Sequence, residues 1–137
     1  MFETYRSPYD YFLQHLKVIK EEYKIWVPEE TLVYTANVLS NGKITYLGDF
    51  LDSEDKKKII KELADNTLLK TYFFDRYKRF FKLNDLVKLG KFYYSLAGEL
   101  YKNQIFYLMS ENLQGIQESI LRLKERIKKE RELYKLL

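Results

Sequence analysis

The sequence has no cysteine and little histidine, proline or glycine. Its 137 residues include one histidine, two prolines and five glycines. Without cysteine the chain has no disulfide, no thiolate metal ligand and no cysteine nucleophile. One histidine, His15, leaves little for a zinc site or for serine–histidine catalysis, and no glycine-rich phosphate loop is present. We therefore expect a protein that is not an enzyme and that carries no cofactor and no metal.

Long hydrophobic runs are also missing. The longest wholly apolar run extends over five residues, from Ile105 to Met109, whereas a membrane-spanning helix needs about 20 residues. The first ten residues do not have the basic and then apolar layout of a secretory signal. We therefore expect no membrane association and a cytoplasmic location.

The composition is that of a folded domain rich in aromatic residues. Hydrophobic residues make up 46% and charged residues 32% of the chain, with 13 tyrosines and nine phenylalanines. This length and balance predict a single domain over residues 1–137 with a substantial core. The aromatic side chains could fill that core, line a pocket for an apolar ligand or contact a partner, and composition does not choose among these.

The spacing of apolar residues is helical along most of the chain. Apolar positions recur every three or four residues, which is typical of amphipathic helices. Ser7 and Pro8 form a helix start, and Asn41-Gly42 forms a helix end. We predict an all-α, single-domain bundle of about six helices, over residues 8–26, 28–41, 53–65, 67–83, 84–102 and 106–137, with a loop at 43–52.

Two of these helices have distinctive apolar surfaces. In the first, a stripe of apolar residues continues to Trp26, so we expect Trp26 to pack inward. In the helix over 67–83, apolar residues cover about two-thirds of the circumference, which predicts a central helix packed on several sides. Arg76 falls inside this apolar arc. Either its stem packs while its charged head reaches solvent, or it forms a buried ion pair with a carboxylate, or it binds an anion.

The C-terminal helix has a heptad pattern longer than four repeats. Apolar residues alternate at spacings of three and four, and Glu130 is the one exception; this seam comprises Phe106, Met109, Leu113, Ile116, Ile120, Leu123, Ile127, Glu130, Tyr134 and Leu137. Packing against the first helix accounts for the seam up to about Ile127. Beyond it, residues 128–137 are expected to project from the body.

The end of this seam predicts a contact with another protein. We expect an adaptor, scaffold or assembly protein that forms a homodimer or captures a partner helix through this end. The residues expected to make that contact are Leu123, Ile127, Tyr134 and Leu137.

Basic residues are concentrated in the middle of the chain, although the net charge is only +4. Residues 70–102 carry eight basic and three acidic side chains. The alternative function is therefore binding of nucleic acid or another polyanion, through Lys78, Arg79, Lys82, Lys88, Lys91 and Lys102 together with Arg76. Against it, most nearby aromatic residues are expected to point inward, and lysines commonly form an ordinary solvated surface or face an acidic protein.

Three successive stretches of the chain together form a recognisable sequence pattern. They carry Tyr34 in the first stretch, Ala64, Asp65, Leu68, Leu69 and Phe74 in the second, and Gly90, Tyr94, Leu96 and Ala97 in the third. This pattern resembles a family of small all-helical bacterial proteins in which a tyrosine-bearing helix precedes a Gly-Asp-x-x-Leu-Phe segment and a helix with glycine, tyrosine and Leu-Ala. Ala64 stands where that family has glycine. The resemblance implies an all-helical fold and a bacterial source, and it implies no function.

Overall fold

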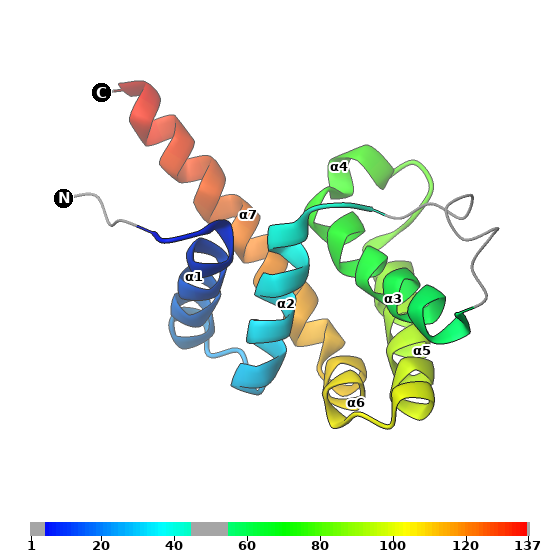
Figure 1. The fold of residues 1–137 in the computed structure, drawn as a ribbon. Coiled ribbons are helices and arrows are strands. Elements are labelled where there is room, and N and C mark those ends of the chain that lie inside the picture. The colour runs from blue at the N-terminus through cyan, green and yellow to red at the C-terminus, as the bar shows by residue number, and fades with distance from the viewer. Residues whose placement is uncertain (1–4, 45–54, 137) are drawn as a thin grey trace.

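The chain folds as an all-helical bundle, as predicted. The computed structural model describes residues 5–44 and 55–136, and these residues form helices without any strand (Figure 1). The helices are α1 (Pro8–Tyr23), α2 (Glu29–Asn41), α3 (Lys56–Tyr72), α4 (Phe74–Tyr77), α5 (Leu83–Tyr101), α6 (Gln104–Glu111) and α7 (Leu113–Leu136). None of the helices described combines the length and the apolar character that a membrane crossing requires. The loop predicted at 43–52 lies mostly outside the described residues.

Helix α1 begins as predicted and ends earlier. The Ser7 hydroxyl accepts a hydrogen bond from the backbone N–H of Asp10 at 3.1 Å, and Pro8 occupies the first turn. The helix stops at Tyr23 because Lys24 adopts a left-handed conformation (φ 52°). The prediction that Trp26 packs inward is wrong, since the helical spacing no longer applies beyond Lys24 and Trp26 is 91% exposed.

The predicted break near residue 66 and the predicted long helix over 67–83 are both wrong. Helix α3 begins after Asp55, whose carboxylate accepts hydrogen bonds from two backbone N–H groups, and it continues without interruption to Tyr72. The predicted start of this helix at residue 53 lies outside the described residues. The chain turns at Phe73 into the four-residue α4. The wide apolar arc therefore belongs to two elements, and Phe80 beyond the turn is 77% exposed.

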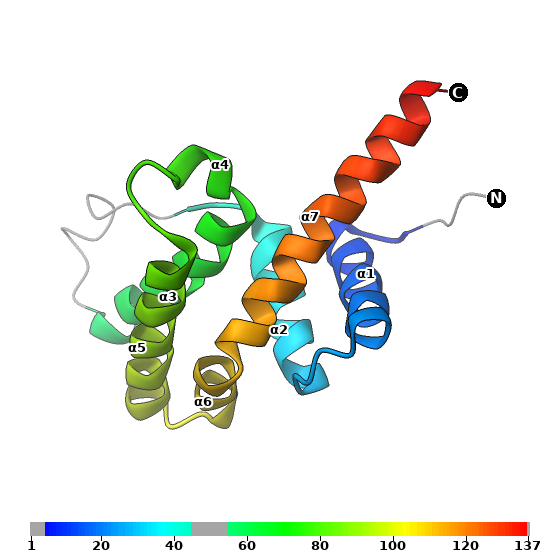
Figure 2. The same cartoon turned by 180° about the vertical axis from the view of Figure 1, so that it is seen from behind.

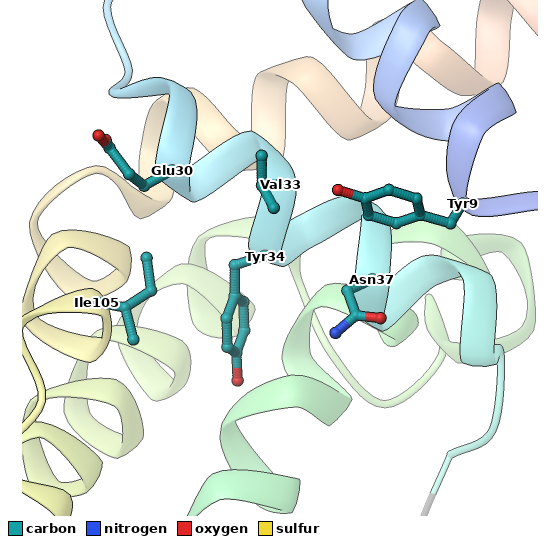
Figure 3. Close-up of a pocket in the computed structure, with 6 residues that line it drawn as sticks. All are labelled: Tyr9, Glu30, Val33, Tyr34, Asn37 and Ile105. Atoms are coloured by element: carbon teal, nitrogen blue, oxygen red, sulfur yellow. The ribbon is translucent and has the colours of Figure 1, made fainter.

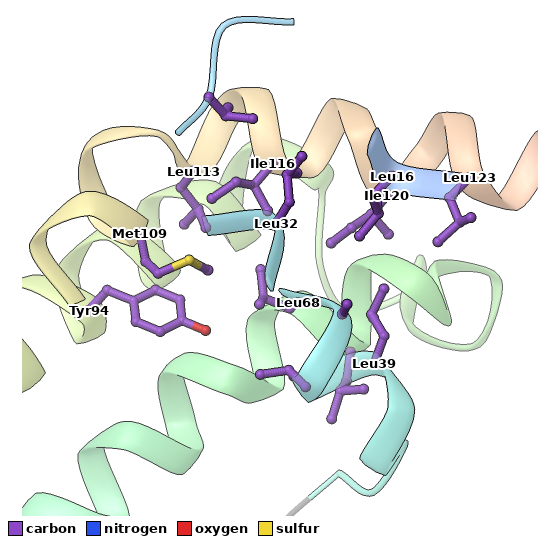
Figure 4. Packing of buried hydrophobic residues seen from close by; sticks show 14 of the residues in the cluster. Leu16, Leu32, Leu39, Leu68, Tyr94, Met109, Leu113, Ile116, Ile120 and Leu123 are labelled. Carbon is purple, nitrogen blue, oxygen red and sulfur yellow. The ribbon is translucent and has the colours of Figure 1, made fainter. Parts of the chain in front are cut away.

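The heptad seam holds the core together, although its helix is interrupted. Helix α6 ends at Glu111, and the side-chain amide of Asn112 donates to the Leu108 carbonyl at 2.9 Å before α7 begins. Six seam residues are nevertheless buried: Phe106, Met109, Leu113, Ile116, Ile120 and Leu123. They meet apolar side chains from α1, α2 and α3, including Leu16, Leu32 and Leu68 (Figure 4).

Helix α7 is the longest of the described helices, and α1 lies antiparallel beside it (Figures 1 and 2). Tyr11, in the first half of α1, contacts Glu130, whereas Glu22 at its end contacts Arg126. The predicted pairing of the first and last helices is therefore confirmed. Beyond this pairing, the end of α7 extends past the body of the bundle, as Figure 2 shows.

Helices α3 and α5 make the most extensive contact in the fold, and Gly90 allows their close approach. A Cβ atom at position 90 would lie 2.7 Å from Thr67 Oγ1 and would also collide with Leu113. We expect Gly90→Ala to destabilise the protein, because overpacking costs about 1–3 kcal/mol while the gain in helix propensity is at most about 1 kcal/mol. Urea unfolding measures this difference. Lys91→Ala, at an exposed position on the same helix, is the control, and a Gly90→Ala protein as stable as that control would contradict the packing described.

Candidate functional site

The last part of α7 exposes apolar side chains that the bundle does not cover. Leu123 is fully buried and Ile127 is half-buried against the core, whereas Leu133, Tyr134 and Leu136 are 61%, 56% and 84% exposed. We call residues 127–136 the distal segment. It leaves the bundle at the red end of the ribbon in Figure 1.

Of the residues predicted to contact a partner, one lies in the core of the bundle and two lie on the distal segment. Leu123 was wrongly predicted, because it belongs to the core and cannot reach a partner. Ile127 and Tyr134 lie on the distal segment, and Leu137 lies outside the described residues. Sequence reasoning missed Leu133 and Leu136 because both lie off the heptad seam. Their spacing of three residues was the available signal, since it places them together on a second face of the helix.

Polar contacts at the start of the distal segment fix the direction in which it leaves the body. Glu130, the exception in the seam, accepts a hydrogen bond from the Tyr11 hydroxyl at 3.1 Å and lies 3.8 Å from Nε2 of the buried His15. The hydroxyl of Tyr5 lies 3.2 Å from the same nitrogen of His15. Burial and the Glu130 carboxylate raise the pKa of Tyr11 to about 12, so the phenol stays protonated and keeps donating even at about pH 10.

A groove lies on the surface of α2, between α1 and α6. It encloses about 560 Å³ and is lined by Tyr9, Glu30, Val33, Tyr34, Asn37 and Ile105 (Figure 3). Its lining is mostly apolar, with the Glu30 carboxylate and the Asn37 amide on its border. The hypothesis of an aromatic-lined pocket inside the bundle gains no support from it, because this groove is open to solvent rather than enclosed in the core.

A polar cluster lies behind the groove and ties three helices together. The Asp65 carboxylate of α3 accepts hydrogen bonds from the hydroxyls of Tyr34 (2.6 Å, α2) and Tyr94 (2.8 Å, α5), and Lys61 lies 2.9 Å from its second oxygen. Burial, followed by the nearby Asp65 charge, raises the pKa values of both tyrosines well above the ordinary value. The cluster is saturated with internal partners, which favours a structural role.

The part of the chain that the structure describes contains no candidate metal-binding cluster. Over residues 5–44 and 55–136, no group of three or more histidine or acidic side chains is arranged to hold a metal ion. The carboxylate of Asp65 is surrounded by phenols and one ammonium rather than by further carboxylates. This arrangement holds the three helices in position relative to one another.

The predicted basic residues lie at the start of α5 and along one side of it. Lys78, Arg79 and Lys82 lie on the connection from α4 to α5, and Lys88 and Lys91 follow on the exposed side of α5. Lys102 directly follows the end of α5. It comes eleven residues, or about three turns, after Lys91, so it lies on the same side of the helix about 16 Å further along.

Arg76 follows one of its two predicted packing modes, whereas two phenylalanines differ from their predictions. The Arg76 side chain is exposed and its guanidinium lies 4.7 Å from the ring centre of Phe73, which agrees with a packed stem and a solvated head and not with a buried ion pair. Phe80 and Phe92 are 77% and 62% exposed, contrary to the expectation that the aromatic residues point inward. We call Lys78, Arg79, Phe80, Lys82, Lys88, Lys91 and Phe92 the basic–aromatic surface.

The chain matches no protein-family model, no curated protein and no solved structure. The resemblance to the small bacterial family therefore stays a prediction. In the fold, the three polar residues that carry it, Tyr34, Asp65 and Tyr94, meet in the single cluster described above. Function must be argued from the surfaces of the molecule itself.

Proposed function

We propose that this protein is a non-catalytic helical adaptor or assembly protein that forms a homodimer through the distal segment of α7. The observation that supports this proposal is the change in burial along one helix. Seam residues up to Leu123 are buried, whereas Leu133 and Leu136, about three to four turns later, are 61% and 84% exposed. A helix that continues past its own core with leucines in solvent offers a surface for another protein.

The energetics favour occupation of this surface. Burying a leucine side chain contributes about 1.5–3 kcal/mol relative to leaving it in water. The distal segment spans only about three turns and has few contacts of its own, so packing against a partner would also stabilise its helical structure. Its orientation is already fixed by Glu130 and Arg126 through their contacts with α1, which lowers the entropy lost on association.

The test replaces both exposed leucines without changing the net charge. In the double variant Leu133→Gln and Leu136→Gln, we expect a mass near 16.7 kDa at concentrations where the wild type approaches twice that value. Light scattering after size exclusion measures the mass. The control is Lys128→Arg with Lys135→Arg, which keeps the charge at two exposed positions away from the two leucines and should dimerise like the wild type. A wild type that stays monomeric, or a leucine variant that dimerises normally, would contradict the proposal.

The basic–aromatic surface supports a second candidate function, binding of single-stranded nucleic acid. Exposed Phe80 and Phe92 lie among five cations, and no ion pair joins those cations to the described part of the chain. Bases can stack on exposed aromatic rings while lysines contact phosphates.

This second candidate has a distinct signature. We expect affinity for a single-stranded oligonucleotide to fall steeply between about 50 and 200 mM salt. Phe80→Ala with Phe92→Ala should weaken binding while leaving the salt dependence nearly unchanged, because the phosphate contacts remain. Fluorescence anisotropy with a labelled oligonucleotide measures both. Binding that survives charge reversal at Lys78, Lys82, Lys88 and Lys91 would exclude this surface.

A further inference from the structure

We propose that the distal segment of one copy docks in the groove on α2 of a second copy, so that two copies exchange their α7 ends reciprocally. This inference rests on the proposed function, because it names the surface that receives the distal segment. The groove is the one between α1, α2 and α6 that Tyr9, Glu30, Val33, Tyr34, Asn37 and Ile105 line (Figure 3). The occupant is a helix with leucines on its outer side.

The groove has the chemistry that an amphipathic helix requires. Val33 is 39% exposed on α2, and the side chains of Tyr34 and Ile105 lie beside it (Figure 3). Polar groups of Glu30 and Asn37 flank this apolar strip, as Figure 3 shows. Its volume is about 560 Å³, and because it is open to solvent a helix can lie along it. Apolar helix faces commonly bind in grooves of this kind.

The two surfaces match in length. Glu30 and Asn37 are seven residues apart on α2, a distance of about 10 Å along a helix axis. On α7, Lys129, Leu133 and Leu136 follow one another at spacings of four and three residues and cover the same distance on one face. In the register that places Leu133 on Val33, Lys129 reaches Glu30.

The charges of the two surfaces are complementary. Residues 124–136 carry six basic and three acidic side chains, a net charge of +3. Residues 8–41, which include α1 and α2, carry three basic and five acidic side chains, a net charge of −2. Glu30, at the border of the groove, is exposed, so it is accessible to a lysine of the second copy.

The distal segment cannot fill the groove of its own chain. Helix α7 lies against the side of α2 opposite the groove, because Leu32 and Leu39 of α2 pack into the core with Ile116 and Ile120 of α7, while Val33 faces solvent. Beyond that contact the distal segment leads away from the bundle (Figure 1). Only a second copy can bring a distal segment to this groove.

The test mixes two variants that each lack one half of the contact. Val33→Glu damages the groove, and Leu133→Gln with Leu136→Gln damages the distal segment. We expect each variant alone to be monomeric by light scattering and an equimolar mixture to form a heterodimer, because one intact segment and one intact groove remain. Val18→Glu, a valine of similar exposure (44%) on α1 outside the groove, is the control and should dimerise like the wild type.

The outcomes separate this inference from the proposed function. A Val33→Glu protein that dimerises like the wild type, with a leucine variant that does not, would overturn the groove and leave association through the distal segment intact. A mixture without heterodimer would also overturn the groove. A wild type that is monomeric throughout would overturn both.

A charge exchange tests the register independently. Glu30→Lys and Lys129→Glu should each weaken dimerisation by up to about fivefold per contact, the usual range for an exposed ion pair, and therefore by up to about 25-fold in a dimer that contains two such contacts. Both changes in one chain should restore it, because the pair is rebuilt with reversed signs. Restoration by Glu30→Lys with Lys128→Glu, a lysine on the other side of α7, would overturn the register.

Discussion

Replacing Asp65 with alanine is expected to lower the free energy of unfolding by about 3 kcal/mol or more, the effect of removing one partner from a buried charged network. The Asp65 carboxylate accepts hydrogen bonds from Tyr34 at 2.6 Å and Tyr94 at 2.8 Å, and it pairs with Lys61 at 2.9 Å. Tyr94 has no solvent exposure at all, so its hydroxyl cannot turn to water when the carboxylate is removed. Helices α2, α3 and α5 lose their common polar contact together.

The substitution Asp65→Asn separates the hydrogen bonds from the charge. An asparagine keeps one oxygen that can accept from both tyrosines, whereas it loses the ion pair with the half-exposed Lys61. We therefore expect a loss of about 1 kcal/mol, clearly smaller than that of the alanine variant. Urea unfolding followed by circular dichroism measures both. An Asp65→Ala protein within about 0.5 kcal/mol of the wild type, the usual range for surface substitutions, would show that the cluster does not stabilise the fold.

Alkaline pH is expected to destabilise the protein steeply, because the hydroxyls of Tyr34 and Tyr94 lie against the Asp65 carboxylate, which strongly disfavours their ionisation in the folded state. Burial, followed by the Asp65 charge, raises the pKa values of Tyr34 and Tyr94 far above the unfolded value near 10. The stability linked to them is fully present below about pH 10 and decreases as the pH rises above it, by about 1.4 kcal/mol per pH unit for each tyrosine. Tyr11, with its pKa raised to about 12, adds a contribution that is lost between about pH 10 and 12.

Tyr34→Phe tests the origin of this dependence. The variant lacks one raised phenol, so its free energy of unfolding should fall less steeply above pH 10 than that of the wild type. Lysine deprotonation in the same range affects both proteins alike and cancels in the comparison. Urea unfolding at several pH values gives the slopes, and tyrosinate absorbance shows when the phenols ionise. Equal slopes for the two proteins would contradict burial of the Tyr34 hydroxyl against Asp65.

Local sequence signals predicted helix ends and buried faces well where these depend on residues of the same helix. Ser7 and Pro8 start α1, and Gly42 ends α2 in a left-handed conformation (φ 59°). The heptad seam correctly predicted burial from Phe106 to Leu123. These features depend on neighbours within one or two turns, which a single sequence displays directly.

Features that depend on distant parts of the chain could not be predicted in the same way. The turn at Phe73 and the exposure of Trp26 depend on where the body of the bundle ends, and helical periodicity does not contain that information. The cluster of Tyr34, Asp65 and Tyr94 joins positions about 30 residues apart on three helices. Leu133 and Leu136 were missed because the seam alone was followed. The projection of residues 128–137 was predicted, but the side chains off the seam that it leaves exposed were not considered.

Amide hydrogen exchange along α7, followed at increasing protein concentration, tests association through the distal segment most directly. Residues 113–123 lie in the core and should exchange slowly at every concentration. In residues 128–136 we predict fast exchange in dilute protein and protection that increases with concentration, because dimerisation stabilises this part of the helix by mass action. Exchange in 128–136 that stays fast and independent of concentration, while the core remains protected, would contradict the account.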